Sequence, residues 1–119
     1  MKALAIALLA ATVALGILLG VSYLGRRRRP SLATIHLVLG AAGIELLLVL
    51  LHWTPAGITL PAGTAAAWAG GLLAAAMFLG LVARLTYRRA PGRAEAMLGA
   101  HAAAGVAGLL VFLSWAARL

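Results

Sequence analysis

The sequence predicts an all-α integral membrane protein, a bundle of four transmembrane helices made of two repeated helical hairpins. The chain is 65% apolar and only 10% charged, whereas soluble domains carry about 25% charged residues. Its apolar residues fall in four segments of the length that a helix needs to cross a bilayer. One pattern, His-x-x-x-Gly-x-x-Gly, occurs twice. The 119 residues leave room for a single domain, 1–119.

The four spans are predicted at about 3–24, 32–53, 63–85 and 95–117. Each segment is rich in Ala and Leu and lacks the alternation typical of strands, which favours helices. The first segment resembles a signal peptide in its Lys2 and apolar run, but its length and the arginines behind it predict a span. The connections are "GRRRRPS" at 25–31, "TPAGITLPAG" at 54–63 and "YRRAPGRAE" at 87–95, with Pro91-Gly92 as the turn of the last.

The net charge of +8 is concentrated in two of these connections. The arginines concerned are Arg26–Arg29 in the first, and Arg84, Arg88, Arg89 and Arg93 in or beside the third. Because basic connections stay in the cytoplasm, we expect a bacterial-type cytoplasmic (inner) membrane protein with both termini outside. The same placement argues against nucleic acid as a partner and for the lipid bilayer, whose anionic headgroups attract arginine.

The repeated pattern reads "HLVLGAAG" at 36–43 and "HAAAGVAG" at 101–108. At helical spacing, each histidine and its two glycines form one stripe, which continues to Leu47 in the first copy and to Phe112 in the second. Each half of the chain runs span, tyrosine, Arg/Pro connection, span. Two hairpins of the same orientation would place both histidines at similar depths, one to two turns from the cytoplasmic end.

A histidine inside a bilayer needs a partner. Imidazoles from two facing helices, with glycines leaving space beside them, suit axial ligation of haem b. We therefore predict His36 and His101 as metal ligands and Gly40, Gly43, Gly105 and Gly108 as cofactor-binding residues. Arginines of the connections, with Ser31 and Thr34, could bind the haem propionates. The alternative is structural: each histidine bonds a carbonyl across helices, and the glycines let backbones approach.

The arrangement resembles four-helix b-type cytochrome membrane subunits, both cytochrome b561-like bundles and the haem-anchoring subunits of respiratory dehydrogenases. "SLATIHLVLG" at 31–40 is similar to the Ser-x-x-His-x-x-x-Gly stretch of succinate dehydrogenase anchors, but Leu37 stands where those proteins have Arg. The resemblance covers two short stretches and the four-span layout. It implies bis-histidine haem ligation, with glycines that make room for the haem.

Three further polar residues lie in or beside the spans. Glu45 falls near the bilayer middle and is expected to be protonated or paired, with a proton relay, a quinone contact or an intersubunit bond as functional alternatives. His52 lies on the same helix face as Glu45, at the outer end of the span. It is expected to be solvated or to anchor the helix at the membrane interface, with a quinone contact as the alternative. Glu95 is expected at a helix N-terminus, where a carboxylate is favourable.

The sequence excludes several classes of chemistry. It has no Cys and no Asp, so it carries no thiolate metal site and no Ser/His/Asp triad, and it contains no phosphate-binding loop. We expect no enzyme on its own. Three functions stay open. The first is a cytochrome subunit of a larger membrane complex, which would transfer electrons to or from partners such as quinone. The second is a haem-free accessory subunit of such a complex, and the third is a small four-helix transporter, which only Glu45 supports.

Overall fold

The computed structural model describes residues 1–53 and 61–118, and these form four α-helices. They are α1 (Lys2–Leu24), α2 (Pro30–Trp53), α3 (Pro61–Thr86) and α4 (Pro91–Ala116). Each is long and apolar enough to cross a membrane, with mean hydropathy between 1.9 and 2.7. The predicted all-α class with four spans is confirmed. Most of the predicted outer connection, at 54–60, lies outside the described residues.

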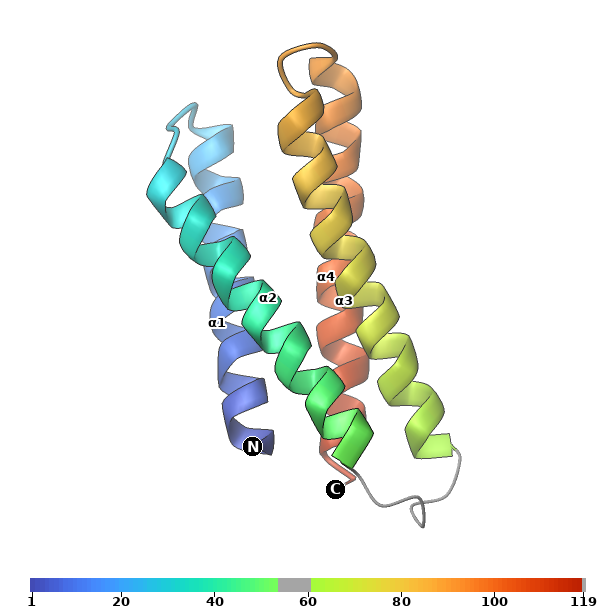
Figure 1. Cartoon of the computed structure of the whole chain (residues 1–119). Helices are drawn as coiled ribbons and strands as arrows, with labels where there is room; N and C mark the ends of the chain where they lie inside the picture. Colours follow the sequence, from blue (N-terminus) through green and yellow to red (C-terminus); the bar gives the residue numbers. More distant parts are fainter. Residues whose placement is uncertain (54–60, 119) are drawn as a thin grey trace. The chain divides into compact units, whose positions relative to one another are not determined.

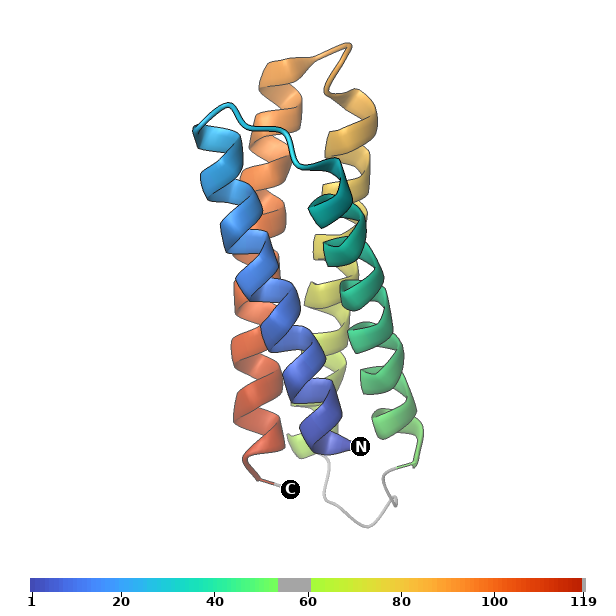
Figure 2. The ribbon, with the colours of Figure 1, turned by 90° about the vertical axis from the view of Figure 1, so that its left-hand side faces the viewer.

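The chain divides into two compact units, Met1–His52 and Trp53–Leu119. In the first unit α1 and α2 run antiparallel, joined by the short connection that carries Arg26–Arg29 (Figure 1). In the second unit α3 and α4 pair in the same way (Figure 2). Each half of the chain is therefore a helical hairpin, as the repeated pattern predicts.

Proline marks the start of three of the four helices. Pro30, Pro61 and Pro91 are the first residues of α2, α3 and α4. A proline suits this position because its fixed φ is already helical and its missing N–H has no partner to lose there. The predicted turn at Pro91-Gly92 is therefore wrong, since the last connection is confined to residues 87–90. Glu95 consequently lies one turn inside α4, beyond the N-terminal position expected for it.

The first connection begins with a left-handed residue. Arg26 has φ 55°, while the preceding Gly25 has φ −77°. The N–H of Arg27 donates to the Ser22 carbonyl at 2.8 Å, and the N–H of Arg26 donates to the Tyr23 carbonyl at 2.9 Å. This pair of bonds is a Schellman motif, which usually places glycine at the left-handed position. Here an arginine occupies it, at a steric cost that glycine would not have.

The buried apolar residues repeat between the hairpins. Leu47 and Phe112 are the two largest fully buried side chains among the described residues, and they lie 65 positions apart in the sequence, as His36 and His101 do. On the first helix of each hairpin, Leu9 and Leu73 are also buried and lie 64 positions apart. The buried positions of the two hairpins thus correspond in the same way as their sequence pattern does.

Candidate functional site

His36 lies in the second turn of α2 and contacts α1. Its Nδ1 is 2.9 Å from the carbonyl oxygen of Thr12. A carbonyl can only accept, so Nδ1 must carry the proton and donate it. In the neutral ring the other nitrogen, Nε2, then holds the lone pair. The contact fixes both the tautomer and the direction in which the imidazole points.

The imidazole of His36 lies against the bare backbone of Gly16. A Cβ atom placed on Gly16 would be 3.1 Å from the Cε1 atom of His36 and 3.6 Å from its Nδ1. Gly16 follows Thr12 by four residues, one helical turn. Because a helical carbonyl points toward the residue four places on, a ring that reaches the Thr12 oxygen from the side must pass over position 16.

The second hairpin repeats this arrangement. The Nδ1 atom of His101 on α4 lies 2.7 Å from the carbonyl oxygen of Ala76 on α3. A Cβ atom on Gly80 would be 2.9 Å from that Nδ1 and 3.1 Å from Cε1. Gly80 follows Ala76 by four residues, as Gly16 follows Thr12. Each hairpin therefore holds one histidine through one backbone carbonyl and one glycine of its first helix.

The two contacts lie at equivalent levels along the first helices. Gly16 precedes Tyr23 by seven residues, and Gly80 precedes Tyr87 by seven. Along the second helices the match is looser, because His36 is six residues after Pro30 and His101 is ten after Pro91. We expected both histidines one to two turns inside their helices, and this holds for His36. His101 lies about one turn deeper, because α4 begins about one turn further from its histidine than α2 does.

The glycines that follow each histidine also face the first helix of their own hairpin. A Cβ on Gly43 would be 2.7 Å from Cδ2 of Leu9, and one on Gly108 would be 2.8 Å from Cγ of Leu73. One turn nearer the histidine, a Cβ on Gly40 would be 3.3 Å from Cγ2 of Thr12.

The first glycine of the second copy of the pattern, Gly105, has more room. A Cβ on Gly105 would lie 3.8 Å from the Cβ of Ala76, which is ordinary contact. The structure thus gives Gly43 and Gly108 a packing role, because leucine side chains fill the space that they leave. A role for these four glycines in holding a cofactor stays a prediction.

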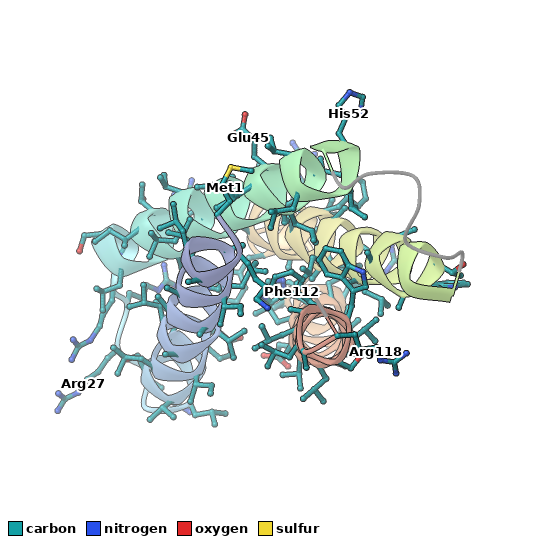
Figure 3. The ribbon with its side chains drawn as sticks, turned by 90° about the horizontal axis from the view of Figure 1, so that it is seen from below. Met1, Arg27, Glu45, His52, Phe112 and Arg118 are labelled. Atoms are coloured by element: carbon teal, nitrogen blue, oxygen red, sulfur yellow. The ribbon has the colours of Figure 1, made fainter. Side chains whose placement is uncertain are left out.

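Glu45 and His52 project from the same side of α2, as their spacing predicts (Figure 3). Both side chains are exposed. Glu45 also lines a shallow, open groove that includes Leu8 of α1 and three neighbours on α2, namely Ala42, Leu46 and Val49. In the described part of the chain, no group of three or more His, Cys, Asp or Glu residues comes together in a way that could hold a metal ion.

The arginines of both connections are exposed. In the first hairpin Arg26–Arg29 join α1 to α2, seven to ten residues before His36. In the second, Arg88 and Arg89 lie between α3 and α4, and Arg93 lies in the first turn of α4. In each hairpin a cluster of arginines therefore precedes the histidine in the chain and lies toward the connection, and this positive charge suits an anionic group.

Sequence reasoning missed four residues of these contacts: Thr12, Gly16, Ala76 and Gly80. The glycines were visible in the sequence, because Gly16 and Gly80 each precede a tyrosine, Tyr23 or Tyr87, by seven residues. The acceptors were not, because the contact uses a backbone oxygen and any residue supplies one. Comparison of the chain with models of protein families, with curated proteins and with solved structures finds no match.

Proposed function

We propose that the chain is a membrane-embedded, b-type cytochrome-like subunit that binds one haem b, with His36 and His101 as axial ligands, and that it transfers electrons within a larger membrane complex. The observation that carries the proposal is the repeated contact between Nδ1 of each histidine and a backbone carbonyl, at 2.9 Å for His36 and 2.7 Å for His101. Both imidazoles sit in helices apolar enough to lie in a bilayer.

This contact prepares an imidazole for a metal. With the proton held on Nδ1, Nε2 is the nitrogen that carries the lone pair, and a bond from Nδ1–H to an acceptor raises its basicity. Histidines that bind metals commonly donate their second nitrogen in this way. The donor set of His36 and His101 therefore fits a haem iron. When bound, a haem supplies one-electron chemistry that the side chains of this chain lack.

The surroundings of each histidine support an anionic cofactor in a membrane. The exposed arginines of each connection lie toward the end of the hairpin where the histidine is, and their charge would suit carboxylates such as haem propionates. The proposal includes the topology that these arginines favour: a bacterial cytoplasmic membrane, with both connections in the cytoplasm and both termini outside. Other membrane subunits and quinone are the proposed electron partners.

A second candidate is a haem-free accessory subunit of a membrane complex. The packing of leucine against Gly43 and Gly108 favours it, because these contacts give the glycines a purely structural purpose. On this alternative the histidine contacts clamp each hairpin, and no cofactor is involved.

The test is a visible spectrum of the full chain, purified in detergent from cells supplied with haem precursor. We expect a sharp α-band in the dithionite-reduced minus oxidised spectrum, and about one haem b per chain by pyridine haemochrome, the stoichiometry that two axial histidines imply. His36→Ala and His101→Ala should each lose the band. His52→Ala is the matched control, since this histidine is exposed and outside the contacts, and it should keep the band.

Two outcomes would contradict the cytochrome proposal. The first is a colourless protein that also takes up no added haem, which would favour the accessory subunit. The second is haem retained at full occupancy in both single variants, which would mean that other residues hold it.

A further inference from the structure

We infer that Gly16 and Gly80 are positioning residues, each of which holds one imidazole in the orientation in which its Nδ1–H donates to a backbone carbonyl. Neither glycine belongs to the repeated His-x-x-x-Gly-x-x-Gly pattern. The positioning of each imidazole by its glycine is inferred from the hairpin geometry alone, whereas its consequence for haem rests on the proposed function.

In the first hairpin two constraints act on one ring. The hydrogen bond holds Nδ1 of His36 at 2.9 Å from the Thr12 oxygen. A Cβ at position 16 would press on Cε1 at 3.1 Å, closer than such contacts normally come. Cε1 is bonded to both ring nitrogens, so a push on it tilts the plane and moves Nδ1 and Nε2 together. An alanine there requires a shift of a few tenths of an ångström, which we expect to lengthen the hydrogen bond or turn the ring.

In the second hairpin the constraint is tighter. A Cβ at position 80 would lie 2.9 Å from Nδ1 of His101, the atom that donates to Ala76 at 2.7 Å. The added methyl would therefore compete directly with the bonded nitrogen, and the ring has less room to adjust than His36. We expect Gly80→Ala to disturb its histidine more than Gly16→Ala does.

The chain provides matched controls on the same two helices. Nothing lies within 4 Å of a Cβ placed on Gly20 of α1 or on Gly71 of α3. We call Gly16→Ala and Gly80→Ala the seat variants. Gly20→Ala and Gly71→Ala change helix propensity in the same way as the seat variants, but the added methyl group does not contact an imidazole. Any effect confined to the seat variants belongs to the contact with the ring.

The experiment is two-bond ¹H–¹⁵N correlation NMR of the full chain, labelled with ¹⁵N-histidine in detergent micelles, which reports the tautomer of each ring. We expect His36 and His101 to show the Nδ1–H pattern in the native chain. Gly16→Ala should shift the signals of His36 alone, Gly80→Ala those of His101 alone, and the two control variants neither. Unchanged ring patterns in both seat variants would overturn the inference.

A double variant keeps the test valid if a seat variant does not fold. When the imidazole of His101 is absent, the methyl group of an alanine at position 80 has no ring to clash with. The double variant Gly80→Ala, His101→Ala should therefore be no less stable than His101→Ala alone. A full additional loss of stability in the double variant would show that Gly80 serves helix packing and not the imidazole.

The two hypotheses fail in different ways. If the native chain binds no haem, the proposed function falls, while the NMR patterns still decide the role of the glycines. If haem is bound, Gly80→Ala should lower its occupancy or shift its midpoint potential, and Gly71→Ala should do neither. Haem bound with an unchanged potential in both seat variants, together with unchanged ring patterns, would refute the positioning role alone.

Discussion

Substitution of Gly108 by alanine tests how closely α3 and α4 approach. A Cβ at this position would lie 2.8 Å from Cγ of Leu73 and 3.2 Å from the Cβ of Leu72. The second of these atoms is attached to the backbone, so it cannot move away by a change of rotamer. To accommodate the methyl group the two helices must separate locally, and Leu73 must leave its buried position.

The expected magnitude is a balance of two terms. Overpacking of a close contact costs about 1–3 kcal/mol, and replacing a helical glycine by alanine gains about 1 kcal/mol from helix propensity. The control is Gly99→Ala on the same helix, because a Cβ there meets nothing within 4 Å. Since both variants gain the propensity term, Gly108→Ala should be less stable than Gly99→Ala by about 1–3 kcal/mol.

The measurement is reversible unfolding in mixed micelles with increasing SDS, followed by far-UV circular dichroism. Both variants should keep the native helix content before the transition, and Gly108→Ala should unfold at the lower SDS fraction. Equal stability of the two variants would refute the close approach of α3 and α4 at this position.

Three further predictions concern stability and use the same assay. Arg26→Gly should stabilise the chain by about 1 kcal/mol because it removes a left-handed non-glycine residue, whereas Arg27→Gly, with the same loss of charge, should not. Leu9→Ala should cost about 2–5 kcal/mol and should lessen the cost of Gly43→Ala, because it removes the side chain that the new methyl would strike. Phe112→Ala should cost about 3–5 kcal/mol as a cavity at a fully buried position; a cost below 1 kcal/mol would contradict its place in the core.

The fold class followed from the sequence because lipid leaves few choices. A backbone inside a bilayer must satisfy its own hydrogen bonds, so four long apolar segments imply four helices. The helix starts were harder to place. Pro91-Gly92 has the composition of a turn, yet Pro91 opens α4, because proline is equally suited to the first turn of a helix. Local sequence does not separate these two uses.

The site was only half visible in the sequence. The stripe from His36 through the glycines to Leu47 was predicted, and the structure shows Gly43 and Leu47 buried on it. The residues that face the stripe were not predicted, because pairing two helices requires knowing which turn of one meets which turn of the other. Apolar membrane helices carry little information of that kind, since lipid and core demand similar side chains.

The acceptor of each histidine is a peptide oxygen, and this has a consequence for how the two halves could diverge. Position 12 is a threonine and position 76 an alanine, yet both supply the same bond. A side-chain acceptor would have required a particular residue type at that position, whereas a main-chain oxygen is present whichever residue stands there. The bond itself therefore makes no demand on the side chain at positions 12 and 76, whereas the imidazole that forms it requires a glycine four residues further on. Two hairpins built this way can drift apart in sequence while keeping the same geometry around each imidazole.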